Sequence, residues 1–220
     1  MSQTDPILGQ KVHNQLVKLG IETPMTPNGL SDGEKMDIIQ PLIAKMLETL
    51  GLDLTDDSLA ETPKRVAKLY TKEFFSGMKY DNFPKCTTVE NKMSTKGEFV
   101  CVRGIDVVSL CEHHLFPIFS DVNKGQHVVV AYIPKKRVLG LSKFSRVVDF
   151  FAKRPQIQER LTQQIMEAFK VILESEDVAV WMEAEHTCMS LRGVKSENAS
   201  TVTLAMSGKF FEDDNIRSEF

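Results

Sequence analysis

The stretch FVCVRGIDVVSLCEHH, residues 99–114, sets the organisation of this chain. An apolar, strand-like run ends in Cys111-Glu112-His113-His114, so a strand would deliver a thiol and two imidazoles to one turn. Cys111 and His114 stand three residues apart. This spacing lets a turn at a strand end present a thiolate and an imidazole to the same ion. We therefore expect a metal site at the end of this strand.

A further ligand is expected from far downstream, because two ligands rarely hold a catalytic metal. Cys188 is the best candidate, since Glu185-His186-Thr187-Cys188 follows a second strand-like run that begins at Val178. Two thiolates and one imidazole with an open fourth position form a zinc site that activates water. The alternative is a pair of buried free cysteines and a hydrogen-bonded histidine, because cysteine is among the most buried residue types.

The remaining two cysteines are poor candidates for the fourth ligand that a structural zinc site requires. Cys101 would lie roughly 33 Å from Cys111 if the strand were continuous. Cys86 lies in a connecting segment with no metal-binding neighbour. An open, catalytic type of site is therefore favoured.

Composition indicates an ordinary globular protein that binds neither nucleic acid nor membrane. The chain has 220 residues, 42% of them hydrophobic and 26% charged, which is enough to bury a sizeable core. No apolar run is long enough to cross a bilayer, and the N-terminus lacks the pattern of a secretory signal. We therefore expect a cytoplasmic protein with reduced cysteines. A net charge of −3 argues against a general nucleic-acid binder but still allows a local basic cluster for a small polyanion.

The pattern of apolar residues changes after Pro84 from a helical period to extended runs. We expect an α+β fold with an antiparallel sheet and helices on one side, in which a helical region, residues 1–84, precedes a domain, residues 85–220. The expected helices span 7–19, 31–50, 62–75, 142–153, 155–173 and 213–220. The expected strands span 87–90, 98–110, 115–119, 126–133, 178–185 and 200–207, with a hairpin joining 115–119 to 126–133. Capping residues are expected at Ser31, Thr62 and Ser142.

Basic residues gather near two of the expected helix starts. Ser142, Lys143 and Arg146 lie within one turn, with Arg154 near the end of the same helix. A helix N-terminus and basic side chains together bind phosphate, although a solvated helix face is the commoner fate of such charges. Arg192, which follows Cys188 by four residues, would lie close to the metal.

Two further groups have both a structural and a functional interpretation. Lys64, Arg65 and Lys68 follow a helix start, where they form either a solvated face or an anion contact across a subunit boundary. Gln158-Glu159 could simply favour the start of a helix, or the carboxylate could grip a guanidine-like edge by accepting two N–H bonds. Sequence spacing leaves both alternatives open.

Taken in order, these motifs closely resemble type I GTP cyclohydrolase. The resemblance extends from about Leu50 to Phe220 and rests on several separate segments. The segments are Glu61–Ala67, Cys111–His114, Ala131–Pro134, Gly140–Lys143, Arg154–Thr162 and His186–Met189.

The resemblance implies a tunnelling fold, with a four-stranded antiparallel sheet and two helices on one face. It implies a decamer of two pentamers with active sites at subunit boundaries. The implied reaction converts GTP and water to formate and 7,8-dihydroneopterin triphosphate, the first step toward folate or tetrahydrobiopterin. Zinc would be held by Cys111, His114 and Cys188, in agreement with the spacing.

Roles for the remaining site residues are also implied by the resemblance. His113 would be the general acid/base at the purine, and His186 a second proton-transfer group. Glu159, with Gln158 beside it, would anchor the guanine edge. The triphosphate would be bound by Ser142, Lys143, Arg146 and Arg192, with Arg65 or Lys68 from a neighbouring subunit.

Two alternatives come from other functional classes. A zinc-bearing oligomeric scaffold could hold nucleotides without turning them over, because a fold does not by itself grant an activity; His113 and His186 argue for catalysis. A zinc deaminase would carry His-x-Glu and Pro-Cys-x-x-Cys, and the sequence has neither. The segment Ser120–His127 is longer than the family leads us to expect, and its turn residues predict a surface turn.

Overall fold

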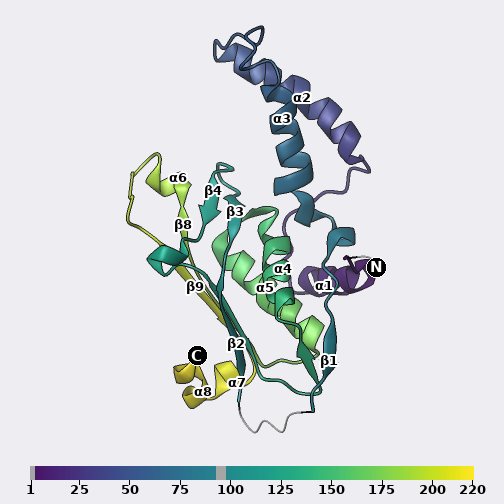
Figure 1. The fold of residues 1–220 in the computed structure, drawn as a ribbon, viewed down its shortest axis with the longest axis vertical. Helices are drawn as coiled ribbons and strands as arrows, with labels where there is room; N and C mark the ends of the chain where they lie inside the picture. Colours follow the sequence, from purple (N-terminus) through teal and green to yellow (C-terminus); the bar gives the residue numbers. More distant parts are fainter. Residues whose placement is uncertain (1–2, 93–97) are drawn as a thin grey trace.

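The computed structural model describes residues 3–92 and 98–220 of the chain. A hairpin formed by helices α2 (Asp32–Thr49) and α3 (Thr62–Lys68) projects from a body made of a sheet and helices (Figure 1). No residue of α2 is buried, although the helix carries several apolar side chains. The expected capping box is confirmed, since Ser31 and Glu34 bond reciprocally at the start of α2.

The third expected helix differs from the prediction at both ends. Thr62 lies inside α3, and the cap position falls to Glu61, which makes no side-chain cap bond. The α-helix ends at Lys68 and continues as a π-helical segment, η1 (Leu69–Phe74). Two short 3-10 turns, η2 (Ser76–Met78) and η3 (Tyr80–Asn82), then lead toward the sheet.

The described residues form one seven-stranded, mostly antiparallel sheet and a two-stranded ribbon, which confirms the α+β class. The sheet is larger than the four strands that the family resemblance implied. Its order is β2-β5-β8-β4-β3-β7, with β9 also paired to β8, and the ribbon pairs β1 with β6. The strands are β1 (Thr88–Glu90), β2 (Val100–Ile105), β3 (Val108–Cys111), β4 (Pro117–Phe119), β5 (Val128–Tyr132), β6 (Arg137–Leu139), β7 (Pro155–Gln156), β8 (Val178–His186) and β9 (Thr201–Met206).

Two expectations about the strands are wrong. The run over residues 98–110 is broken after Ile105 into β2, which pairs with β5, and β3, which pairs with β4 and β7. The expected hairpin does not form either, since β4 and β5 each pair with β8 instead of with each other. The intervening turn holds a 3-10 segment, η4 (Val122–Lys124), and its exposed residues make the surface turn that was expected.

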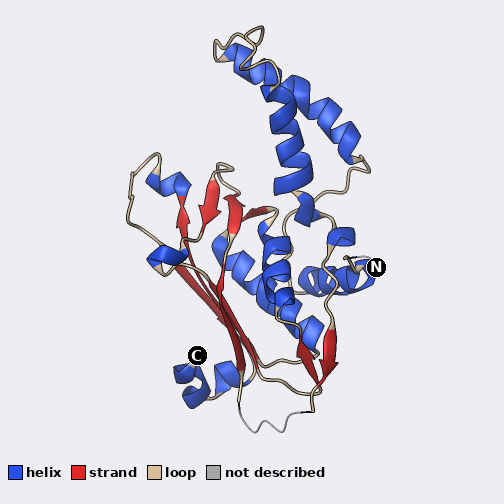
Figure 2. Cartoon of the chain, in the orientation of Figure 1, coloured by secondary structure: helices blue, strands red, loops and turns tan. Residues whose placement is uncertain are grey.

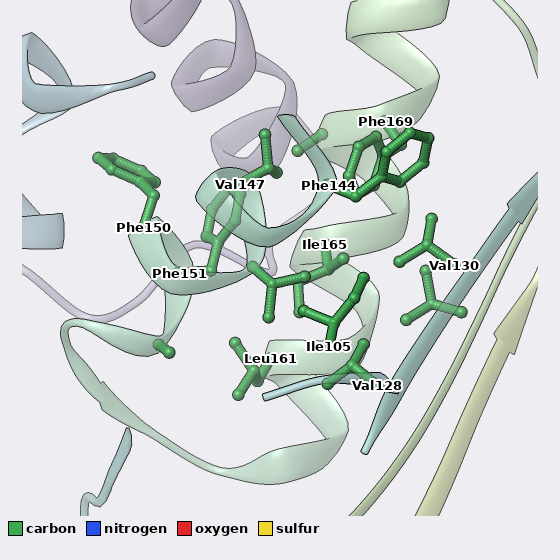
Figure 3. Close-up of a cluster of buried hydrophobic side chains, with 14 of the residues drawn as sticks. Ile105, Val128, Val130, Phe144, Val147, Phe150, Phe151, Leu161, Ile165 and Phe169 are labelled. Atoms are coloured by element: carbon green, nitrogen blue, oxygen red, sulfur yellow. The ribbon is translucent and has the colours of Figure 1, made fainter. Parts of the chain in front are cut away.

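Helices α4 (Ser142–Ala152) and α5 (Gln158–Leu173) cover one face of the sheet (Figure 2). Their apolar sides meet the strands in the main core, which Figure 3 shows in close-up. The rings of Phe144 and Phe169 stack between the two helices with centroids 5.0 Å apart. Ser142 does not cap α4, because the helix already begins at this residue and Leu141 holds the cap position.

Helix α5 starts three residues later than expected. Pro155 pairs with Leu110 in the parallel β7–β3 ladder, so the chain is still extended at the position where a helix was predicted. This short strand brings the first turn of α5 beside the end of β3. The arrangement decides the geometry of the candidate site.

The two ends of the chain also lie against the body. Helix α1 (Pro6–Lys18) buries Val12 and Leu16 in the main core, so the first helix is part of the same body as the sheet. The chain ends in α7 (Lys209–Glu212) and α8 (Asp214–Glu219), close to the expected terminal helix. A division at residue 84 remains a prediction. Among the residues that the structure describes, no helix is both long and apolar enough to span a membrane.

Candidate active site

Strand β4 brings the two predicted ligand segments together. Leu110 of β3 lies opposite Pro117, and Ile118 lies opposite His186 of β8. The Thr187 hydroxyl, in the short helix α6 (Thr187–Ser190), donates a 2.7 Å hydrogen bond to the Pro117 carbonyl. Strands β3 and β8 therefore run parallel on either side of β4, and their C-terminal ends lie at the same end of the sheet.

A compact group of metal-binding side chains lies at this end of the sheet. The ligand atoms of Cys111, His186 and Cys188 all lie within 4.8 Å of one another. Cys111 is buried, with 3% of its surface exposed, and the other two are half-buried. All four cysteines are free thiols. Two sulfur donors and an imidazole are the donor set that zinc prefers among the divalent ions.

The two adjacent histidines of the turn lie next to this group. His113 Nδ1 is 3.5 Å from Cys111 Sγ. His114 is outside the 4.8 Å group, and its Nε2 lies 3.2 Å from Nη1 of Arg192. A guanidinium can only donate, so His114 Nε2 is the acceptor and carries a lone pair. His114 is exposed, and the lone pair is available to a cation if the ring turns away from Arg192.

The pKa values of two groups in this cluster are shifted, in opposite directions. Burial and the neighbouring Cys111, which accepts a hydrogen bond and carries charge when ionised, raise the pKa of the Cys188 thiol. Burial lowers the pKa of His186, and nearby Glu159 partly opposes this effect. A divalent ion beside the Cys188 sulfur would favour its thiolate form and so offset the rise in its pKa. The residues therefore fit a metal.

The start of α5 supplies polar groups from the next element. Gln158 is fully buried; its Nε2 donates to the Thr201 carbonyl at 2.8 Å and to Thr203 Oγ1 at 3.1 Å. Its Oε1 lies 2.8 Å from Nε2 of His186. Gln158 is thus engaged within the protein, whereas the side chain of Glu159 is exposed and near enough to affect the pKa of His186.

Most of the residues expected to bind triphosphate lie elsewhere in this chain. Ser142 and Lys143 begin α4, while the far end of α4 leads through β7 to Cys111. Ten residues of α-helix span about 15 Å, so these groups are a helix length away from the thiols. Arg146 lines a hollow with Ser76, Asn82 and Lys153. Arg65 and Lys68 are exposed on the projecting hairpin.

Arg192 and Arg154 have opposite placements. Arg192 contacts His114 and so lies beside the thiols, as expected. The prediction that Arg154 belongs to a phosphate-binding cluster is wrong, because the side chain is enclosed in the core. Its side chain has no exposed surface and forms an ion pair with Glu22, at 3.1 Å. A polyanion cannot reach it.

Sequence reasoning missed three residues that hold the Cys111 turn in place. The backbone N–H of Glu112 donates to the Gln156 carbonyl at 3.0 Å, and the Glu112 carboxylate forms an ion pair with Arg160. These contacts exist because β7 runs parallel to β3 with Gln156 opposite Cys111. No spacing in the sequence signals this two-residue strand.

Comparison with known proteins supports the resemblance. The family model described as GTP cyclohydrolase I matches residues 39–220 of this chain. A protein named GTP cyclohydrolase 1 from Mannheimia succiniciproducens is 50% identical over 211 residues, which cover 96% of this chain and 94% of that protein. Proteins of the same name from Shewanella amazonensis and Haemophilus ducreyi are 48% and 50% identical over the same shares of both chains.

Proposed function

This chain belongs to the GTP cyclohydrolase I family of enzymes, and on that premise we propose that it converts GTP and water to formate and 7,8-dihydroneopterin triphosphate. The observation that carries the proposal is the meeting of Cys111, Cys188 and His186 beside the exposed Glu159. In this proposal, the groups that bind metal, transfer protons and bind guanine lie close together at the ends of β3 and β8. The product would feed folate or tetrahydrobiopterin synthesis in the cytoplasm, where free thiols persist.

We assign a zinc ion to Cys111, Cys188 and His114. The two sulfurs already lie together, and His114 contributes a lone pair from an exposed turn. His186 also lies beside the sulfurs, and its Nδ1 carries a lone pair when Nε2 donates to Gln158, so the choice of His114 as the third ligand rests on the family resemblance. When bound, zinc supplies Lewis acidity that ionises water near neutral pH.

The chain's own residues orient the purine and move protons. The Glu159 carboxylate accepts two N–H bonds from the guanine edge in plane, which fixes the ring against the start of α5. His113, on the exposed turn, donates a proton to N7, so that C8 becomes electrophilic and a water can add there. His186 then acts as the second proton-transfer group from the end of β8.

The atoms balance over the whole reaction. The first water adds to C8, and the imidazole ring opens to a formamide. A second water cleaves the formamide and releases formate, which leaves a free amine on the pyrimidine. The ribose rearranges to a ketone, and the amine condenses with it to close the dihydropterin ring with loss of one water. The net consumption is one water for each GTP.

We also propose that the site is completed by a neighbouring subunit. Ser142 and Lys143 lie at the end of α4 that is farther from the thiols, about a helix length away, so we infer that another copy supplies these groups. Helix α2 supports an assembly, because its apolar side chains at Ile38, Leu42 and Met46 remain exposed. A decamer of two pentamers is the assembly that we expect, within the tunnelling fold of the family.

The proposal is tested by incubating the purified protein with GTP. Formate and a pterin that fluoresces after oxidation should both appear, in equal amounts. Cys188→Ala should abolish them and lower the zinc content, while Cys86→Ser, at a thiol outside the group, should leave both unchanged. Binding of GTP without release of formate would favour the nucleotide-holding scaffold instead. Light scattering of the same sample measures the assembly, and a monomer with full activity would refute the shared site.

A further inference from the structure

The turn that carries His113 and His114 buries few of its side chains, so burial contributes little to fixing its conformation. His113, His114, Leu115 and Phe116 are all exposed. Leu115 adopts a φ of +55°, a backbone conformation that residues other than glycine rarely adopt. Two backbone bonds close the turn, from Cys111 N–H to the Phe116 carbonyl at 2.7 Å and from Leu115 N–H to the Cys111 carbonyl at 2.8 Å. Other contacts must fix the turn against the start of α5.

Those contacts are one ion pair and one backbone hydrogen bond. The guanidinium of Arg160, in the first turn of α5, pairs with the Glu112 carboxylate, and the Arg160 side chain is only 13% exposed. The Glu112 N–H donates to the Gln156 carbonyl at 3.0 Å. Glu112 is therefore held on both its backbone and its side chain. Charge-assisted bonds of this kind are the stronger class of hydrogen bond.

The Arg160 guanidinium also donates a hydrogen bond to Gln156. Its Nε donates to Oε1 of Gln156 at 3.4 Å. The Gln156 amide is buried and donates to the Phe151 carbonyl at 2.9 Å and to Gln164 Oε1 at 2.8 Å. Because both of these partners accept, Oε1 of Gln156 must face Arg160.

Gln164 connects Gln156 to the N-terminal part of the chain. Its Nε2 donates to the Ile21 carbonyl at 2.7 Å and lies 3.2 Å from Thr23 Oγ1. Consecutive hydrogen bonds thus connect Ile21, Gln164, Gln156 and Arg160. Residues 21 and 23 precede the part of the chain that the family model matches.

We propose that Arg160 is a positioning residue for the reaction, acting through Glu112 on the turn that carries His113 and His114. It touches neither the substrate nor the metal. It sets the distance between the turn, which supplies the proton donor, and the start of α5, which supplies Glu159. The inference rests on the proposed function, because it assigns the support of that site.

The test is a double-mutant cycle with Glu112→Gln and Arg160→Met. Each single variant should lower kcat roughly 10- to 100-fold, because a displacement of about 1 Å at a reacting group has an effect of this size. KM for GTP should stay within about threefold, since Glu159 remains on α5. The double variant should be no slower than the slower single variant. Arg160→Lys should recover part of kcat because it keeps the charge.

Lys170→Met is the matched control, because it removes another buried ion pair, with Glu167 at 2.8 Å, from the far end of α5. It should leave kcat unchanged. Multiplying losses in the double variant, or a fall in kcat for Lys170→Met equal to that for Arg160→Met, would overturn the assignment. If Arg160→Met fails to fold, Arg160→Lys and the isosteric Glu112→Gln carry the comparison.

A second readout is independent of turnover. In the cobalt-substituted protein, the visible d–d bands report the geometry around the metal, and they should shift in Glu112→Gln but not in Lys170→Met. Unchanged bands together with an unchanged kcat in Glu112→Gln would contradict the positioning role. A wild-type protein without turnover would sink the proposed function, while the cobalt spectra would still decide whether Arg160 orients the turn.

Discussion

Gln158 Oε1 lies 2.8 Å from His186 Nε2, and the remaining contacts of Gln158 decide which atom carries the proton. The Gln158 amide nitrogen donates to the Thr201 carbonyl at 2.8 Å, and a carbonyl can only accept. This fixes the orientation of the amide, so Oε1 faces His186 as an acceptor. Neutral His186 must then be protonated on Nε2, which leaves the lone pair on Nδ1.

Replacing Gln158 by Leu should both destabilise the protein and release this tautomer. The Thr201 carbonyl and His186 Nε2 would lose their partner, which costs about 1–3 kcal/mol for each buried group left unpaired. Urea unfolding measures the loss, and 15N shifts of the imidazole distinguish the two tautomers. Gln163→Leu is the control, because Gln163 is exposed on the same helix. A wild-type spectrum with the proton on Nδ1 would contradict the assignment.

The choice of imidazole ligand can be decided by two alanine variants. We expect His114→Ala to lose zinc, because His114 Nε2 carries a lone pair and lies in the same turn as Cys111. His186→Ala should keep zinc and lose turnover, because the family resemblance assigns proton transfer, not metal binding, to this imidazole. Metal analysis of both purified proteins makes the comparison. Zinc lost from His186→Ala and kept in His114→Ala would show that the ligand is the imidazole nearest the thiols here.

Exchanging Glu159 for Gln should weaken the binding of GTP without affecting the metal. The amide keeps the size of the side chain but replaces one acceptor oxygen by a donor, so it cannot accept two N–H bonds from a guanine edge. We expect the affinity for GTP to fall by roughly 10- to 100-fold, in line with the loss of a charge-assisted bond. Calorimetry measures the affinity, and unchanged zinc content is the internal control. Loss of zinc would show that Glu159 is misplaced.

The thiol of Cys86 should be inert at neutral pH, in keeping with its exclusion from the metal site. Burial raises the pKa of Cys86 to about 11, with a smaller opposing effect of Lys143. At pH 8 only about one thiol in a thousand is then ionised, so alkylation should be slow and should accelerate about tenfold for each pH unit. Mass spectrometry of the alkylated protein gives the rate. Rapid labelling of Cys86 at pH 7 would contradict the burial of this thiol.

Local signals in the sequence predict most of the helices and the two segments that meet at the candidate site. The reciprocal bonds of Ser31 and Glu34 are a local pattern, and α2 starts where that pattern predicts. Cys111 and Cys188 were paired because each follows a strand-like run, and the ends of β3 and β8 do meet. Local periodicity, however, does not show which strands are neighbours. The β4–β5 hairpin was therefore wrong, because β8, from far downstream, pairs with both strands.

Side-chain burial was the other quantity that spacing could not supply. Arg154 and Arg146 look alike in sequence, since both follow basic Lys143 on or near one helix. In the fold, Arg146 is exposed and Arg154 is fully enclosed. The difference arises because Glu22, on a loop far upstream, returns to pair with Arg154. Only long-range contacts separate a potential anion contact from a buried structural cation.

The Arg154–Glu22 pair should be a principal stabilising contact between the N-terminal segment and the body. Glu22 also accepts from Tyr80 at 2.5 Å and from the Thr23 N–H at 2.8 Å, while the Arg154 guanidinium lies 4.9 Å from the ring centre of Phe151. Glu22→Ala would leave the Arg154 charge buried and without its carboxylate. Removal of one partner of a buried ion pair typically costs 3–5 kcal/mol, so we expect a loss of about 4 kcal/mol in the free energy of unfolding.

Asp149→Asn is the matched control for that variant. Asp149 pairs with Lys153 at 3.5 Å on the same helix as Phe151, but its side chain is 64% exposed. Exposed pairs of this spacing contribute about 0.3–0.5 kcal/mol, so the control should unfold almost as the wild type does. Guanidinium or urea titration of all three proteins gives the comparison. Equal, small losses for Glu22→Ala and Asp149→Asn would mean that water replaces the carboxylate beside Arg154, and that other contacts of the N-terminal segment, such as the burial of Val12 and Leu16, hold it to the body.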